Sequence, residues 1–369
     1  MKDLNAYKLL TPGPLTTTPT VKETMLVDRC TWDSDYNAIT EEIRHELLKL
    51  AHVDNGQYTA VLMQGSGTFG VESVLTSIPA KDDTVLVLVN GAYSKRMCSI
   101  LEHAGIKYET LEYAWDEIPD TKSVDDYLND HPHISMVSMV HSETTSGLLN
   151  DIESIGKIVK KYGKIFIVDA MSSFGAVDID MGKIGIDFLI SSANKCIQGV
   201  PGFSFIIGKL DVLVASKGNA RSLSLDLYDQ FDTMEHHGGK WRFTSPTHVV
   251  AAFRQALREL EAEGGQPARF ARYQKCNKLL REGMEKLGFK AYIKDELQGP
   301  IITTYLYPEN FKVDFAAMHE FLKQNGYVIY PGKLTDIDTF RLGNIGEIYE
   351  EDIEKILSLF KAYKEQADA

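Results

Sequence analysis

Apolar residues in the middle of the chain form short continuous runs, and amphipathic stretches separate several of these runs. The runs have the length and composition of buried strands, and they are Thr84–Val89, Ile134–Val140, Lys164–Val168, Phe188–Ser191 and Phe203–Ile207. The amphipathic stretches predict helices at Ala92–Ala104, Val124–Asn129 and Ile152–Tyr162. Strands that are apolar throughout and alternate with helices indicate an α/β fold with a mainly parallel sheet covered on both faces.

The remainder of the chain predicts an arm and a second, smaller domain. A helix is expected at about 38–52, and a long helical region spans roughly 247–286 with a break at Gly264 and Gly265. The tail has a different order, with strands or helices predicted at Ile301–Tyr305, Phe315–Asn325, Tyr327–Tyr330, Thr339–Leu342 and Tyr349–Tyr363. We therefore expect an N-terminal arm over residues 1–20, a large α/β domain over 21–265 and a small α+β domain over 266–369. The arm is too rich in Pro, Gly and Thr for regular structure, and it could return to pack on the small domain.

Composition narrows the possible partners. The 369 residues contain 39 Lys and Arg and 52 Asp and Glu, which gives a net charge of −13 and disfavours nucleic-acid and membrane binding. We find neither an apolar run of membrane-spanning length nor the pattern of a signal peptide at the N-terminus. The four cysteines are far apart and have no metal-binding spacing, which indicates a reducing, cytoplasmic location and no metal site: Cys30, Cys98, Cys196 and Cys276.

The alternation begins at about residue 60 with a further expected strand, and a glycine-rich turn, Gln64–Gly70, follows it and leads into a probable helix at about 69–78. Glycines allow close approach of backbone N–H groups, and a helix N-terminus attracts anions, so this turn could hold a phosphate. Ser66 and Thr68 add hydroxyl groups. Gly65, Gly67 and Gly70 also match the weak G-x-G-x-x-G pattern of dinucleotide sites, so a dehydrogenase and a plain glycine turn both stay open.

Two later strands end in residues that can carry chemistry. Asp169 follows the strand Lys164–Val168, and Lys195 lies just beyond Phe188–Ser191 among small residues. Each has an ordinary explanation, since Asp169 could cap the next element and Lys195 could be a surface lysine with a buried stem. Together with a phosphate-binding turn, however, they match the needs of pyridoxal 5′-phosphate. The turn would hold its phosphate, Asp169 would face the ring nitrogen, and Lys195 would form the Schiff base.

The chain also resembles a known family over most of its length, from about Leu9 to Glu347. The segments that carry the resemblance are, in order, LLTPGPLT, CTWDSDYN, QGSGTFGVE, NGAYSKRM, MVHSETTSG, IVDAMSSFG, ISSANKCIQGVPG, SLSLDLYDQ, KWRFTSPTH, VIYPGK and RLGNIGE. They are similar to those of the class V aminotransferases, which are fold-type I pyridoxal-phosphate enzymes. The resemblance implies a large domain with a mostly parallel, seven-stranded type of sheet and a small C-terminal α+β domain.

The resemblance also implies roles for individual residues. Lys195 and Asp169 would be catalytic, and Arg341 would grip the substrate carboxylate with its bidentate fork. The expected cofactor-binding residues are Ser66, Gly67, Thr68, Tyr93, Thr144, Asp169, Asn194 and Lys195, with Thr244 reaching the cofactor phosphate of the partner subunit. Alternatives are that Arg341 is a surface arginine paired with Glu347, and that Tyr93 is merely a half-buried tyrosine after a strand.

The implied activity is transfer of an amino group from 2-aminoethylphosphonate to pyruvate, giving phosphonoacetaldehyde and L-alanine, by a homodimer with shared sites. An alanine- or serine-type transaminase acting on glyoxylate or pyruvate is the alternative within the family. A dehydrogenase is the alternative from another class, but Asn90 and Gly91 stand where it would need an acidic residue for the ribose.

The roles of His141 and of Trp32–Asp35 stay open, and the pairs His131/His133 and His236/His237 are interpreted as loop residues.

Overall fold

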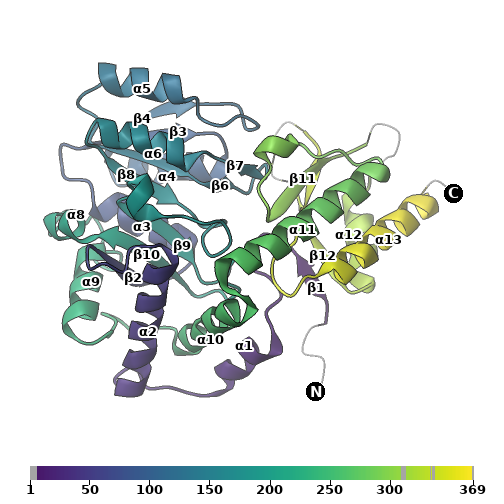
Figure 1. The fold of residues 1–369 in the computed structure, drawn as a ribbon, viewed down its shortest axis with the longest axis horizontal. Coiled ribbons are helices and arrows are strands. Elements are labelled where there is room, and N and C mark those ends of the chain that lie inside the picture. Colours follow the sequence, from purple (N-terminus) through teal and green to yellow (C-terminus); the bar gives the residue numbers. More distant parts are fainter. Residues whose placement is uncertain (1–5, 309–312, 333, 335–336, 368–369) are drawn as a thin grey trace.

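A computed structural model describes residues 6–308, 313–332, 334 and 337–367. The larger part of the molecule is built on a seven-stranded sheet (Figure 1), with spatial order β2-β10-β9-β8-β5-β3-β4. The strands are β2 (Tyr58–Gln64), β3 (Thr84–Val89), β4 (Lys107–Glu112), β5 (Met136–Val140), β8 (Ile165–Asp169), β9 (Phe188–Ser192) and β10 (Phe203–Lys209). Only β10 runs antiparallel to its neighbours, so the predicted α/β class with a mostly parallel sheet is confirmed.

Helices pack around this sheet, and several of them contact its strands directly through buried apolar residues. They are α1 (Pro19–Glu23), α2 (Ser34–Leu50), α3 (Gly67–Ser77), α4 (Ala92–His103), α5 (Thr121–Asp130), α6 (Ile152–Lys161), α7 (Met181–Ile184), α8 (Leu210–Ala215), α9 (Leu227–His236) and α10 (Thr247–Glu263). Short polar side chains cap the N-termini of several of these helices. Asp151, for example, accepts a hydrogen bond from the backbone N–H of Ser154 at the start of α6. A short hairpin, β6 (Ser142–Glu143) and β7 (Leu148–Leu149), follows β5.

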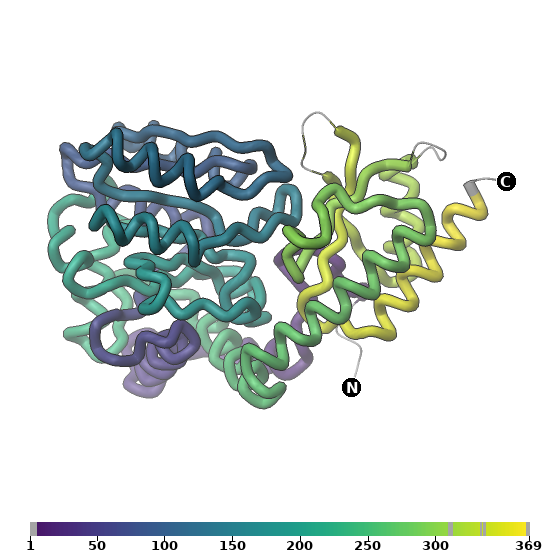
Figure 2. Tube along the Cα trace, turned by 45° about the horizontal axis from the view of Figure 1, so that its top comes forward, coloured from purple at the N-terminus to yellow at the C-terminus, as the bar shows by residue number. Residues whose placement is uncertain are grey.

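The smaller part, mostly green to yellow in Figure 2, contains a four-stranded sheet with order β1-β12-β13-β11. Its elements are β1 (Lys8–Leu10), β11 (Ile302–Leu306), β12 (Tyr327–Pro331), β13 (Thr339–Gly343), α11 (Gly265–Lys286), α12 (Phe315–Gln324) and α13 (Glu350–Ala367). The two parts have separate apolar cores, and the core of the smaller part combines residues of α11 to α13 with Leu10. On this basis we propose the domain boundary at residues 265–266; residues 1–5 of the predicted arm and 368–369 lie outside the described residues.

Two expectations need correction. The arm is not free of regular structure, because Lys8–Leu10 pair in parallel with Tyr327–Ile329 and add a strand to the small sheet. Strand β4 was not expected either, since Lys107–Glu112 alternates charged and partly apolar residues, as suits the edge of a sheet. Among the described residues, no helix is long and apolar enough to cross a membrane.

The parallel strands bring their carboxyl ends to one edge of the large sheet, where helix α3 begins. This helix packs closely on β9 and β10 at Gly70, where a Cβ atom would lie 2.6 Å from Ser204 Oγ and 3.1 Å from Ile190 Cγ2. A larger residue would therefore push the start of α3 away from the strand ends. The close packing places the turn Gln64–Gly67 next to the residues that follow β8 and β9.

Candidate active site

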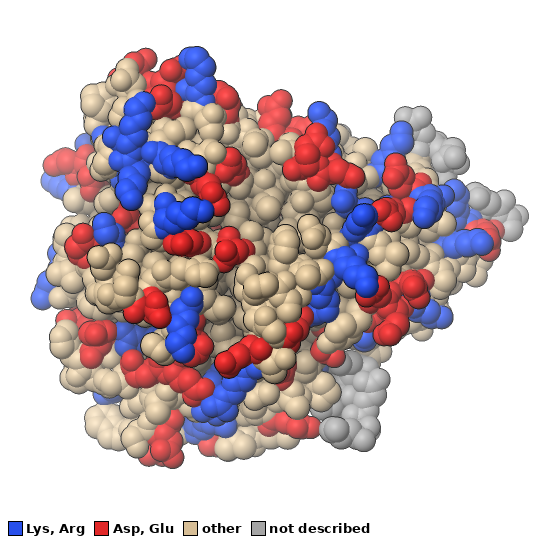
Figure 3. Space-filling view, viewed as in Figure 1, with Lys and Arg blue, Asp and Glu red and all other residues tan. Residues whose placement is uncertain are grey.

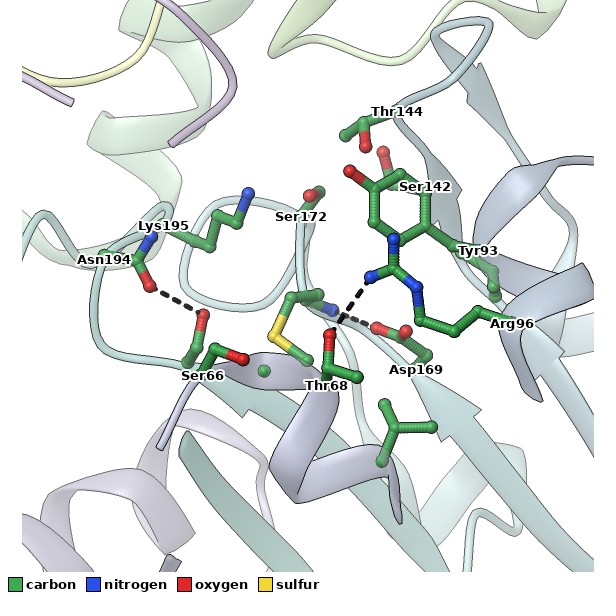
Figure 4. A pocket seen from close by; sticks show the side chains of 15 residues that line it. Ser66, Thr68, Tyr93, Arg96, Ser142, Thr144, Asp169, Ser172, Asn194 and Lys195 are labelled. Atoms are coloured by element: carbon green, nitrogen blue, oxygen red, sulfur yellow. Dashed lines mark hydrogen bonds between the residues drawn. The ribbon is translucent and has the colours of Figure 1, made fainter. Parts of the chain in front are cut away.

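A cavity of about 170 Å³ lies at the carboxyl ends of β8 and β9, beside the N-terminus of α3. Figure 4 shows side chains from all three elements pointing into it. Eight of the residues singled out from the sequence line this one cavity: Ser66, Gly67, Thr68, Tyr93, Thr144, Asp169, Asn194 and Lys195. Residues that lie more than 120 positions apart in the chain therefore meet at one place.

One wall of the cavity is the N-terminus of α3. Ser66 is the extended residue before the helix, and its side chain does not cap the helix N–H groups. Gly67 approaches Met171 so closely that a Cβ atom would lie 2.4 Å from its sulfur, so a side chain at position 67 would fill the space in front of the helix. Donors at a helix N-terminus together with the helix dipole favour an anion, and phosphate is the common one.

Asp169 lies at the end of β8 and is 4% exposed. One carboxylate oxygen accepts a hydrogen bond of 2.9 Å from the backbone N–H of Met171. Burial raises the pKa of this carboxyl from 3.8 to about 6, and the nearby Glu143 acts in the same direction, while Lys195 and Arg96 oppose it. An ionised Asp169 therefore favours a positively charged partner in the cavity.

Lys195 lies in the turn after β9, and its Nζ donates a hydrogen bond of 2.8 Å to the carbonyl oxygen of Pro12 in the N-terminal arm. Burial lowers the pKa of this amine, and the nearby Tyr93 opposes that change. A lowered pKa increases the fraction of free amine at neutral pH, which is the form that attacks carbonyl carbon. The pKa of Asp169 is thus raised and that of Lys195 lowered, and both shifts favour the neutral form of the side chain.

Tyr93 and Arg96 enter the cavity from the first turns of α4. The backbone N–H of Tyr93 donates to the buried carboxylate of Glu143 at 3.2 Å, which fixes this end of the helix. The guanidinium carbon of Arg96 lies 4.9 Å from the centre of the Tyr93 ring, and its Nη1 donates to Thr68 Oγ1 at 3.0 Å. Sequence reasoning missed Arg96, although its position three residues after Tyr93 on the same helix face was a usable signal.

Arg341 is carried by β13 of the small sheet and is 5% exposed. Its Nε donates to the carbonyl of Pro331 and its Nη1 to that of Thr144, both at 3.0 Å. Burial lowers the pKa of its guanidinium, and the nearby Tyr93 and Tyr330 oppose this change. Arg341 is therefore a buried residue next to the cavity and not the surface arginine of the alternative interpretation.

Some predicted residues lie elsewhere. Thr244 is exposed and does not line the cavity of its own chain, and Trp32 is 76% exposed. His141 is buried and contributes to a different cavity, and its Nδ1 has no hydrogen-bond partner. Burial lowers the pKa of His141 to about 4.

Ser142, Ser172 and Ser192 line the site but were not singled out from the sequence. In the part of the chain that the structure describes, no three His, Cys, Asp or Glu residues are grouped to hold a metal ion.

Comparison with known proteins shows the family of the chain. The family model "Aminotransferase class-V" matches residues 29–333. The chain belongs to the class V aminotransferases. It is 54% identical over 360 residues to the 2-aminoethylphosphonate–pyruvate transaminase of Lysinibacillus sphaericus, a match that covers 98% of each chain. It is 53% identical to the transaminase of the same name from Bacteroides fragilis, over 97% of this chain and 99% of that one.

A solved aminotransferase structure has the same fold as this chain over its whole length. The ureidoglycine–glyoxylate aminotransferase of Bacillus subtilis superposes with a TM-score of 0.89 at 22% sequence identity, covering 100% of this chain and 95% of its own. The fold-type I architecture expected from the sequence is thereby confirmed for this class V aminotransferase.

The raised pKa of Asp169 predicts how the cofactor-free protein depends on pH. The Asp169 carboxyl contributes most to the free energy of unfolding when it is protonated. This contribution is lost as the pH rises from 3.8 through about 6, because the carboxyl ionises more readily in the unfolded chain than in its buried position. Asp169→Asn, which cannot ionise, should be more stable than the natural protein at pH 8 by about 1–3 kcal/mol. The difference should narrow as the pH falls toward 4, which urea denaturation at several pH values measures. An unchanged difference across this range would contradict the assigned ionisation.

Proposed function

We propose that this protein is a pyridoxal-phosphate-dependent aminotransferase that transfers the amino group of 2-aminoethylphosphonate to pyruvate, producing phosphonoacetaldehyde and L-alanine. The observation that carries the proposal is the meeting of Lys195, Asp169 and the N-terminus of α3 in one cavity. The choice of substrates rests on relatives that are 52–54% identical over nearly the whole chain and carry the corresponding name.

The residues of the cavity fit pyridoxal phosphate in their chemistry. When bound, this cofactor supplies an electrophilic aldehyde and a ring that accepts electrons from the substrate carbon. Ser66, Gly67 and Thr68 offer the anion-binding end of α3 to its phosphate, with Asn194 close by. Asp169 offers a carboxylate to a protonated ring nitrogen, and the aromatic ring of Tyr93 and the hydroxyl of Thr144 complete the walls.

The work of the chain in this reaction is mostly proton transfer and orientation. Lys195 would hold the cofactor through its aldehyde. Once the substrate amine has replaced it there, the free amine of Lys195 would be the base that moves a proton between the substrate carbon and the former aldehyde carbon of the cofactor. The lowered pKa of Lys195 suits a general base. Asp169, once ionised, would favour a proton on the ring nitrogen of the bound cofactor. The same residues serve pyruvate in the return half-reaction, so ping-pong kinetics are expected.

A panel of amine donors and acceptors tests the proposal. 2-Aminoethylphosphonate with pyruvate should yield alanine, and Lys195→Ala should form none although it keeps the fold. L-Alanine and L-serine with glyoxylate serve as the comparison, because they are the substrates of the alternative within the family. Turnover of L-alanine with glyoxylate, combined with no alanine formation from 2-aminoethylphosphonate, would favour that alternative.

Arg341 should bind the anionic group of both substrates. Its guanidinium is held by two backbone carbonyls, which leaves further N–H donors for a ligand. Arg341→Ala should lower kcat/KM for pyruvate by an amount equivalent to roughly 2–5 kcal/mol, as expected when a charged partner loses its contact. Arg341→Lys should recover only part of this loss, because a point charge lacks the bidentate fork. Cofactor binding, followed by visible absorbance, should not change; if it does, Arg341 acts on the cofactor instead.

We further propose that the protein acts as a homodimer in which Thr244 reaches the partner subunit's cofactor phosphate. Supporting this, a cavity of about 520 Å³ beside the phosphate-binding turn is lined by Phe69, Leu225, Trp241 and Phe243. Phe69 is 48% and Phe243 52% exposed, and apolar surface of this kind favours contact with another protein.

Mixing two inactive or weakened variants tests the shared site. A dimer of one Lys195→Ala chain and one Thr244→Ala chain should contain one site in which both residues are natural. Activity of the mixture at limiting cofactor should therefore exceed that of either variant alone. Full activity in a species that sediments as a monomer would contradict the shared site.

A further inference from the structure

The backbone turn that follows Lys195 contains a conformation that side chains disfavour. Gln198 has a φ of 70°, and among the described residues only His52, with a φ of 57°, is another non-glycine residue at positive φ. Such a conformation persists only where surrounding contacts hold it, and it is enriched at functional sites. The contacts of Gln198 therefore bear on how Lys195 is placed.

Gln198 is 4% exposed and is held at both its backbone and its side chain. Its backbone N–H donates to the carbonyl of Lys195 at 2.8 Å, which closes the turn. Its side-chain Nε2 donates to the hydroxyl of Tyr273 at 2.6 Å and to the carbonyl of Gly346 at 3.0 Å. A shorter side chain would lose both contacts and would leave the turn without these anchors.

A second anchor acts on the residue next to Lys195. Arg269 of α11, which is 1% exposed, donates to the carbonyl of Cys196 at 2.6 Å and forms an ion pair of 2.6 Å with Glu263. The Tyr273 hydroxyl also donates to the Cys196 carbonyl, at 3.3 Å. Two side chains of α11 thus hold the carbonyl of Cys196, the residue that follows the lysine.

The same contacts connect the turn to the strand that carries Arg341. Gly346 lies three residues after β13, and its carbonyl accepts hydrogen bonds from both Gln198 and Arg272. Arg272 also donates to the carbonyl of Ile348 at 3.0 Å. A displacement of the segment after β13 would therefore be transmitted through Gln198 to the turn that holds Lys195.

We infer that Gln198 is a positioning residue: its side-chain bonds to Tyr273 and Gly346 hold the turn at positive φ, aim the Lys195 amine into the cavity and link it to the segment following Arg341. The inference rests on the proposed function of Lys195. It concerns the direction and basicity of the amine and not the choice of substrate.

Two substitutions separate positioning from mere relief of strain. Gln198→Ala keeps the unfavourable backbone conformation and loses both side-chain bonds, whereas Gln198→Gly loses the bonds but removes the backbone penalty. His52→Ala and His52→Gly form the matched control pair, because His52 also has a positive φ, is itself exposed and bonds only Asp178 among the described side chains. All four variants are prepared as holoenzymes and compared with the natural protein.

Positioning predicts that stability and activity respond differently. Gln198→Gly should have a higher Tm than Gln198→Ala, yet both should lose roughly 10- to 100-fold in kcat, as expected for a misplaced catalytic group. KM for pyruvate should change much less than kcat. The pH midpoint of the visible absorbance of the bound cofactor, which reports on its bond to Lys195, should shift in both Gln198 variants. The His52 pair should differ in Tm while keeping the natural kcat and pH midpoint.

Natural kcat and an unshifted pH midpoint in Gln198→Gly would overturn the inference, since the side-chain bonds would then serve stability alone. The absorbance readout needs no substrate, so it tests Gln198 even if 2-aminoethylphosphonate proves not to be the donor. Failure of the donor panel with the natural protein, in contrast, would count against the proposed substrate and leave the absorbance result intact.

Discussion

The burial of two groups that normally carry opposite charges, the Asp169 carboxyl and the Lys195 amine, is the constraint on which the site depends. Asp169 ends β8 and Lys195 follows β9, and these two strands are paired in the sheet, so both groups lie at the same edge, next to the cavity. Burial shifts the pKa of each toward the neutral form. A buried ionisable group is costly without a partner, so the cavity is suited to a ligand that supplies a cation to one group and a carbonyl carbon to the other.

The rest of the fold serves to keep these groups in place and to bring in residues from the small sheet. Arg341 lies beside the cavity, where its guanidinium is held by the carbonyls of Pro331 in its own sheet and of Thr144 after β6. The arm contributes from the other direction, since β1 pairs with β12 and Pro12 then contacts the amine of Lys195. Both connections cross from one sheet to the other, so the relative position of the two sheets determines the geometry of the site.

Local pattern in the sequence accounts for much of this structure. Strand β3 has the bounds that its apolar run predicts, and Asp169 and Lys195 were found by asking which residues follow buried strands. The resemblance to a family, and not the pattern, pointed to Arg341. What could not be predicted depends on distant partners: Gln198 bonds residues 75 and 148 positions away, and nothing near it in the sequence signals a positive φ. Strand β4 was missed for a related reason, because an edge strand has no second neighbour to require an apolar run.

The charge of the molecule bears on how it could select anionic substrates. Acidic and basic side chains are interspersed over the face shown in Figure 3, and the net charge of −13 repels anions at long range. Attraction must therefore come from fixed charges near the cavity, where solvent screening is weak. Arg96 and Arg341 both supply guanidinium groups next to Tyr93, because Arg96 lies over its ring and Arg341 is hydrogen-bonded to its side chain. A phosphonate carries more negative charge than a carboxylate, so an arrangement with two guanidinium groups would favour it more strongly than a single arginine could.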